Sequence, residues 1–176
     1  MKKEILEWVK TIILSVVIAL VITTFIKPTI VRQESMSPTL NEYDFLIINR
    51  FLYKQGLPKH GDIVVFESNL KTNFGKNKLL IKRVIAVPGD ELLIQEGVIY
   101  LNGNILDESY ISVYTDGKGY EDVPITIPEG KVFAMGDNRG SSMDSRDQAI
   151  GLVDIDDIVG RAFLRLFPFN RIGFLD

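Results

Sequence analysis

The 176-residue sequence predicts a mainly β fold, in which an N-terminal transmembrane helix is followed by a β-barrel or sandwich-like domain. Two observations carry this prediction. A single uncharged apolar run lies near the N-terminus, and the remainder is divided into short β-branched runs that end at Gly, Pro, Asn or Asp. With 46% hydrophobic residues, the chain has enough apolar material for one domain with a substantial core.

The apolar run covers residues 11–26 and contains neither a charged residue nor a helix breaker. As a helix it covers roughly 24 Å, close to the ~30 Å hydrocarbon core of a bilayer once the adjoining Trp8 and Val9 are added. The alternative is a cleavable signal peptide, which should end in a small-x-small site. The run is instead followed by "KPTIVRQES", without such a pair close by, so we expect a retained single-pass anchor in the cell membrane.

The charges around this run predict its orientation. Three lysines and two glutamates precede it, and their sum of +1 favours a cytoplasmic N-terminus, although Lys27 and Arg32 on the far side weaken the asymmetry. The predicted organisation is therefore a short cytoplasmic segment at 1–10, an anchor at 11–26 and an extracytoplasmic β-rich domain at 27–176.

The body of the chain predicts seven strands, at residues 44–50, 61–66, 79–87, 91–95, 97–103, 131–136 and 157–167. Asn102-Gly103 predicts the turn of a hairpin within "GVIYLNGNIL". Residues 107–122 are polar, glycine-containing and acidic, which predicts a surface excursion between strands.

Composition excludes several classes of site. A net charge of −3 and a pI near 5.3 do not fit the clustered basic surface of a nucleic-acid-binding protein. The absence of cysteine excludes disulfides, thiolate metal sites and a cysteine nucleophile, and the single histidine excludes a multi-histidine metal site.

Lys82 is the first candidate for chemistry, because it lies within an apolar, β-branched strand. Alternation along a strand places Leu80, Val84 and Ala86 on its side and Arg83 on the other. Burial disfavours an ammonium ion and lowers its pKa, and a neutral amine can act as a general base. The alternative is a structural lysine that extends to solvent or pairs with a carboxylate.

Two serine-rich loops supply further candidates. "QESMSPTL" places Ser35 in an extended or turned segment, where a serine with a base nearby can be a nucleophile, although an ordinary turn is the simpler interpretation. "GDNRGSSMDSR" at residues 136–146 is either a solvated turn or a loop fixed by paired charges. His60 precedes a strand and is interpreted as a surface residue rather than the base of a serine triad.

Five motifs in order resemble the bacterial type I signal peptidases of the Gram-positive type. An N-terminal span is followed by "SMSPTL", "GDIVVF", "IKRVIAVPGD", "GDNRGSSMDSR" and "RLFPFN", so the resemblance covers nearly the whole chain. It implies a membrane-anchored serine endopeptidase that removes signal peptides from exported preproteins through a Ser-Lys dyad and an acyl-enzyme. It also implies lipid bilayer as surroundings, no cofactor or metal, and substrates with small residues one and three places before the cut.

The resemblance also implies roles for individual residues. Ser35 matches the nucleophile and Lys82 the general base, and Met36 follows the nucleophile and shapes the site. Ser142 matches a serine that hydrogen-bonds the lysine amine. The remaining matches are charged residues: Asp144 and Arg146 as an ion pair behind the dyad, with Asp137 and Arg83 as supporting charges.

Gln33 departs from the family pattern, since relatives commonly carry serine or glycine two places before the nucleophile. The second oxyanion donor therefore stays open between the Gln33 amide and the backbone. Two rival functions are also weighed. A self-cleaving repressor would share the dyad but replace the span with a DNA-binding or regulatory segment, and a silent peptide-binding β module would lack Ser35 or Lys82.

Overall fold

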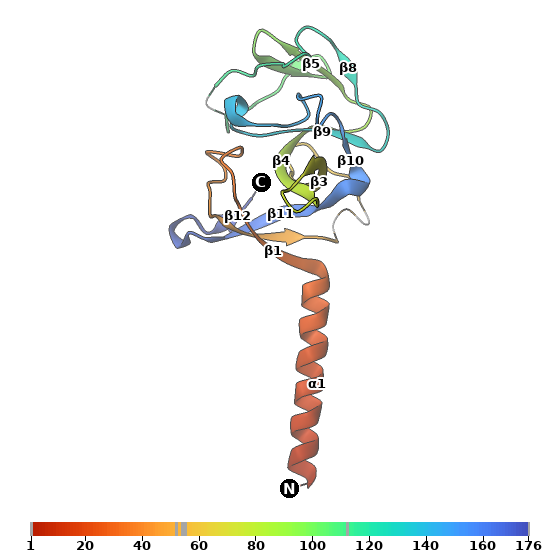
Figure 1. Cartoon of the computed structure of the whole chain (residues 1–176), viewed down its shortest axis with the longest axis vertical. Helices are drawn as coiled ribbons and strands as arrows, with labels where there is room; N and C mark the ends of the chain where they lie inside the picture. Colours follow the sequence, from red (N-terminus) through yellow and green to blue (C-terminus); the bar gives the residue numbers. More distant parts are fainter. Residues whose placement is uncertain (1, 52, 54–55, 112, 176) are drawn as a thin grey trace.

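The structure is a computed structural model and describes residues 2–51, 53, 56–111 and 113–175. It begins with one helix, α1 (Lys2–Phe25), which projects away from a β-rich body in Figure 1. The helix contains neither Gly nor Pro, and its central residues are apolar on every face. The stretch Lys3–Phe25 is long and apolar enough to cross a membrane.

The body contains two antiparallel sheets. The larger has the order β1-β2-β11-β3-β4-β9-β10, with β12 paired to β11, and the smaller has the order β7-β6-β5-β8. The strands of the larger sheet are β1 (Ile26–Ile30), β2 (Phe45–Asn49), β3 (Ile63–Lys71), β4 (Asn77–Ala86), β9 (Lys131–Met135), β10 (Val153–Asp154), β11 (Ile158–Phe167) and β12 (Gly173–Phe174). The strands of the smaller sheet are β5 (Glu91–Gln95), β6 (Val98–Leu101), β7 (Asn104–Ile105) and β8 (Ile125–Thr126). The short 3-10 helices η2 (Arg139–Ser141), η3 (Ile155–Asp157) and η4 (Phe169–Arg171) lie in the connections.

The predicted mainly β class is confirmed, with sandwich-like sheets rather than a closed barrel. Among the described residues β1 and β10, at the two ends of the larger sheet's strand order, do not pair with each other. All seven strands predicted from the sequence are present, whereas β1 and the short strands β8, β10 and β12 were not predicted. The predicted boundary after residue 26 therefore falls inside β1, because the helix ends at Phe25 and Ile26 already pairs with Asn49.

The helix is joined to the body without a free linker. Ile26 follows Phe25 directly as the first residue of β1, which pairs with β2 over its whole length. The Arg50 N–H donates to the Phe25 carbonyl at 3.0 Å, so the end of β2 is bonded to the end of the helix. The first strand of the sheet is thereby fixed to the end of α1.

The hairpin turn predicted at Asn102-Gly103 is present between β6 and β7. Asn102 has φ 53° and Gly103 has φ 77°, the left-handed conformation that a two-residue hairpin of this kind requires. Asn and Gly tolerate that conformation better than other residues.

β4 lies between β3 and β9 and passes through the centre of the body. Leu80 and Val84 pack in one apolar cluster with Val64 and Phe66, as the alternation predicted. The prediction for Ala86 is wrong, because its side chain packs with the cluster of Ile85. The pairing of β4 with β9 shifts register between Val84 and Ala86, and a bulge of this kind interrupts the alternation.

Candidate active site

Ser35 lies on the loop between β1 and β2, and its neighbours hold this loop against the body. Met36, the next residue, is 1% exposed and packs in a core cluster with Val31 and Leu40. The Leu40 N–H also donates to the Met36 carbonyl at 2.8 Å, which closes a turn. Because Met36 is fixed inside the core, the adjacent Ser35 has a defined position and stays partly exposed.

Lys82 comes from the middle of β4 and has a side chain that is 1% exposed. Its Nζ lies 2.8 Å from Ser35 Oγ and 3.0 Å from the Ile81 carbonyl oxygen. Within the described residues no carboxylate forms an ion pair with it. The structure therefore brings Ser35 and Lys82, 47 positions apart, within hydrogen-bond distance.

Burial lowers the pKa of Lys82 to about 8, because desolvation disfavours the ammonium form. The charge of Asp144 opposes this change, and the charge of Lys78 reinforces it. An appreciable fraction of Lys82 is then a neutral amine at neutral to mildly alkaline pH. A neutral amine at hydrogen-bond distance can accept the proton of a serine hydroxyl.

The loop of residues 136–146 packs directly against the Ser35 loop. The Asn138 N–H donates to the Ser35 carbonyl at 3.0 Å, and the Asn138 side-chain amide donates to the Glu34 carbonyl at 3.2 Å. Gly136 allows the close approach, because a β-carbon there would lie 2.4 Å from the Ser35 carbonyl oxygen. These contacts fix the Ser35 backbone from the side of the loop of residues 136–146, in addition to the packing of Met36.

Arg83 and Asp137 form a buried bidentate pair. Arg83 Nε and Nη2 donate to the two carboxylate oxygens of Asp137 at 3.0 and 2.9 Å, and Nη1 donates to the Gly61 carbonyl at 3.0 Å. A pair with this geometry compensates both charges and restricts their orientation. It joins the loop of residues 136–146 to β4, next to Lys82.

Asp144 and Arg146 form a second buried pair, with Nε and Nη2 of the arginine each 2.9 Å from a carboxylate oxygen. Burial alone would raise the pKa of Asp144, but the hydrogen bonds and charge of Arg146, helped by the Gly136 N–H, hold this pKa below its usual value. Asp144 is consequently ionised over the physiological pH range. Its negative charge also favours the ammonium form of Lys82 and so opposes the lowering of the Lys82 pKa by burial.

Ser142 is buried next to Gly136, and a β-carbon on Gly136 would lie 2.2 Å from Ser142 Oγ. Its hydroxyl contributes to the low pKa of Asp144 but forms no hydrogen bond of regular geometry in the described part of the chain. In particular, the structure contains no Ser142–Lys82 hydrogen bond among these residues. The hydrogen bond that the resemblance implies for Ser142 stays a prediction.

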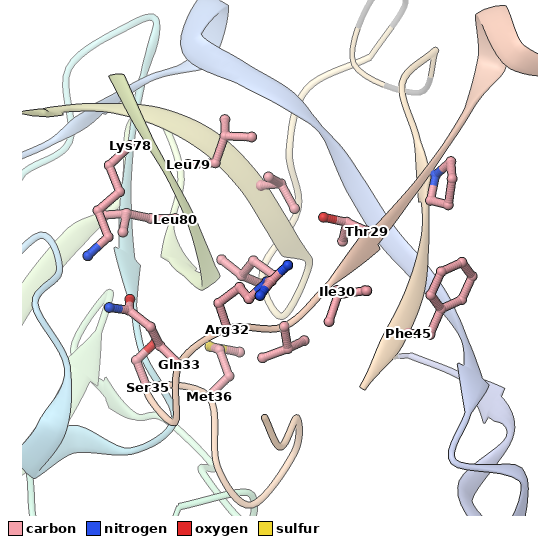
Figure 2. Close-up of a pocket in the computed structure, with 14 residues that line it drawn as sticks. Thr29, Ile30, Arg32, Gln33, Ser35, Met36, Phe45, Lys78, Leu79 and Leu80 are labelled. Carbon is pink, nitrogen blue, oxygen red and sulfur yellow. The ribbon is translucent and has the colours of Figure 1, made fainter. Parts of the chain in front are cut away.

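Two cavities meet at Ser35. A groove of about 620 Å³ runs along residues 28–33 and β4, and Figure 2 shows the side chains that line it. A smaller cavity of about 360 Å³ lies on the side of Ser141 and Met143. Gln33 lines both cavities, is exposed, and its side-chain amide forms no hydrogen bond with another described residue.

Comparison with known proteins identifies the family. The family model "Signal peptidase, peptidase S26" matches residues 5–167. The chain belongs to the signal peptidase family, peptidase S26. It is 38% identical to signal peptidase I of Bacillus licheniformis, covering 97% of this chain and 93% of that one. It is also 38% identical to signal peptidase IB of Staphylococcus aureus (strain COL), covering 97% and 94% respectively.

A crystal structure of a signal peptidase I from Enterococcus faecalis V583 is 29% identical, with a TM-score of 0.47, and covers 60% of this chain and 97% of that chain. The family model and the curated relatives confirm the family resemblance predicted from the five motifs, and the protein is a peptidase.

Sequence reasoning missed Arg139 of this peptidase. Its side chain is buried and forms an ion pair with Glu108, a hydrogen bond with Thr115, and a bond from Nε to the Gly136 carbonyl at 3.2 Å. The segment predicted as a surface excursion therefore supplies buried partners to the loop of residues 136–146. Arg139 is part of the motif "GDNRG", but its partners Glu108 and Thr115 lie 31 and 24 positions away in the sequence.

His60 of the peptidase lies away from Ser35. It is exposed, and its Nε2 is 2.6 Å from Asp90 Oδ2. His60 lines neither of the cavities that meet at Ser35. The structure therefore places a lysine, and not this histidine, next to the candidate nucleophile.

Proposed function

We propose that this peptidase removes N-terminal signal peptides from exported preproteins, with Ser35 as nucleophile and Lys82 as general base. One observation carries the assignment of the dyad: Lys82 Nζ is 2.8 Å from Ser35 Oγ, and the Lys82 side chain is 1% exposed. The names of the relatives, signal peptidase I and IB, support the substrate class.

The proposed reaction begins with neutral Lys82, which accepts the Ser35 proton while Oγ attacks the scissile carbonyl carbon. The resulting oxyanion accepts a hydrogen bond from the Ser35 N–H, which donates to no other described residue. Lys82, now an ammonium ion, protonates the leaving amine as the C–N bond breaks and an acyl-enzyme forms. The neutral lysine then removes a proton from a water molecule, and the water oxygen attacks the ester. As the ester bond breaks, Lys82 returns this proton to Ser35 Oγ.

The groove of about 620 Å³ is the proposed binding site for the residues that precede the cut. A substrate bound there as an extended strand directs alternate side chains to the same side. The residues one and three places before the cut therefore face the enzyme together. The walls they meet include Ile30, Val31, Met36 and Ile81, which favour apolar side chains.

Helix α1 supports the proposal that the peptidase is a single-pass membrane protein with a cytoplasmic N-terminus. None of the most apolar window of Lys3–Phe25 is buried against the rest of the molecule. An unburied apolar helix of about 36 Å is stable in a bilayer and costly in water. The body then lies on the outer face, where exported preproteins emerge.

The deciding experiment is incubation of the full-length protein, purified in detergent, with a model preprotein. Mass spectrometry of the products should show one cut, after a small-x-small sequence at the end of the signal peptide. An uncut preprotein, or cuts scattered through the mature part, would contradict the proposal. Alkaline extraction of membranes tests the anchor: the full chain should stay in the pellet, and a soluble full chain would contradict it.

A further inference from the structure

Four residues line both cavities at once: Gln33, Ser35, Lys78 and Leu80. They therefore mark the boundary where the larger groove ends and the smaller cavity begins. A peptide bond placed over Ser35 has its preceding residues on one side of this boundary and its following residues on the other. This inference rests on the proposed function, which assigns the larger groove to the residues before the cut.

The smaller cavity of about 360 Å³ is then left for the residues that follow the cut. Its charged lining residues are Lys71, Lys78, Lys82 and Glu34. Lys82 must be neutral to act as a base, so its charge does not count in the reactive form. The two remaining ammonium groups exceed the one carboxylate, which gives the cavity a positive charge.

Among the basic residues that line these cavities, Lys78 is the one that lines both of them together with the reactive serine. It is partly buried and lies four residues before Lys82, so the alternation of β4 directs both side chains to the same face. Figure 2 shows its side chain directed toward the loop that carries Gln33 and Ser35. The charge of Lys78 also acts on Lys82, which agrees with this placement.

Within the described part of the chain the Lys78 ammonium has no hydrogen-bond acceptor. The backbone carbonyl of Lys78 accepts a hydrogen bond from Ser68 Oγ at 2.8 Å. The Lys71 ammonium donates to the neutral side chain of Asn77, and Glu34 forms no ion pair with another described residue. A partly desolvated cation without an acceptor gains free energy when a bound group supplies a carboxylate.

The alternation of an extended substrate identifies the position of that carboxylate. Side chains one and three places before the cut face the enzyme, the first residue after the cut faces away, and the second faces the enzyme again. We propose that the smaller cavity is a cationic subsite that selects an acidic side chain at the second position after the cut, with Lys78 as the specificity-determining residue. An anionic lipid headgroup is the less favoured occupant. Lys78 and Ser35 line the same cavity, so a group bound to Lys78 lies where the substrate residues after the cut are expected.

The test uses the full-length enzyme in neutral detergent micelles with three soluble peptides. They share one sequence with small residues one and three places before the cut and differ only in Glu, Gln or Lys at the second position after it. For the wild type, kcat/KM should fall in that order, with Glu preferred over Gln by about fivefold to tenfold at low salt. The preference should shrink in 0.5 M salt, because screening weakens a partly exposed ion pair.

The readout for each variant is the ratio of kcat/KM for the Glu peptide to that for the Gln peptide, so that a change in overall rate does not affect it. Lys78→Gln should bring the ratio close to one, and Lys78→Glu should invert the order and favour the Lys peptide. Lys76→Gln is the matched control, because this exposed lysine precedes β4 and lines neither cavity. It should keep the wild-type ratio.

The outcomes separate this inference from the function on which it rests. If the wild type cuts none of the three peptides, the proposed function fails. If it cuts all three equally well, or if Lys78→Gln keeps the wild-type ratio, only the cationic subsite fails. A preference that is absent in neutral micelles and appears only on vesicles containing phosphatidylglycerol would assign Lys78 to the lipid surface and also overturn the subsite.

Discussion

The Ser142 side chain occupies the space in which a β-carbon on Gly136 would lie, at 2.2 Å from Ser142 Oγ. The same β-carbon would lie 2.4 Å from the Ser35 carbonyl oxygen. A glycine at the start of the loop of residues 136–146 therefore allows the Ser35 loop, Ser142 and the end of β9 to meet at one point.

Gly136→Ala should reduce kcat by at least about tenfold and destabilise the fold by about 1–3 kcal/mol, because backbone on one side and a buried side chain on the other must move. Gly140→Ala is the control, since a β-carbon there meets no atom within 4 Å. Peptide cleavage and thermal unfolding measure both effects. Wild-type activity and stability in Gly136→Ala would show that the two loops do not approach this closely.

Ser35→Ala should abolish cleavage while changing the unfolding free energy by less than about 1 kcal/mol, because a partly exposed loop hydroxyl adds little to the core. Cleavage of the model preprotein and circular dichroism provide the two measurements. His60→Ala is the comparison and should cut at nearly the wild-type rate. Residual activity in Ser35→Ala together with inactivity in His60→Ala would reverse the assignment.

Lys82→Arg should be inactive although it keeps a positive charge, because a guanidinium stays protonated and cannot accept the serine proton. For the wild type, kcat/KM should rise with pH through an apparent pKa of about 8, since the reactive form of Lys82 is the neutral one. A rate that falls over that pH range, or an active Lys82→Arg variant, would mean that the charge and not the basicity of the residue is needed.

Lys82→Met should be inactive and yet more stable than the wild type. The pKa of Lys82 falls from 10.5 to about 8 on folding, so the unfolded chain binds more protons in that window and stability rises with pH through it. Below pH 8 the folded wild type carries a buried ammonium at a cost of about 3 kcal/mol. Thermal unfolding in detergent should show a higher Tm for Lys82→Met at pH 7 and a smaller difference at pH 10. Equal Tm values at pH 7 would show that Lys82 is well solvated.

Gln33→Ala should keep near-normal turnover, because the exposed Gln33 side chain has no described hydrogen bond that would fix it as an oxyanion donor. The second donor then comes from the backbone. Steady-state kinetics decide the matter: a loss of about 10²–10³ in kcat with little change in KM would instead assign this role to the Gln33 amide.

Much of this architecture could be predicted from the sequence, because β-branched runs and Asn-Gly turns act locally. Lys82 was identifiable for the same reason, as a cation inside an apolar strand. Ala86 was misplaced, since a bulge depends on pairing with β9 rather than on the sequence of β4 itself. The partners of Arg139 were not predictable, because Glu108 and Thr115 lie in a segment without periodicity that folds onto the loop only in three dimensions.

The direct continuation of α1 into β1 has a geometric consequence. Ser35 follows the last helical residue, Phe25, by ten positions, of which five form β1. Ten residues reach at most about 36 Å even when fully extended, and the pairing of β1 with β2 leaves little of that reach adjustable. With α1 in the bilayer as proposed, the nucleophile operates at a fixed height above the membrane surface. The length of the segment between α1 and Ser35 thus determines which peptide bonds of a membrane-inserted substrate lie at the same height as Ser35.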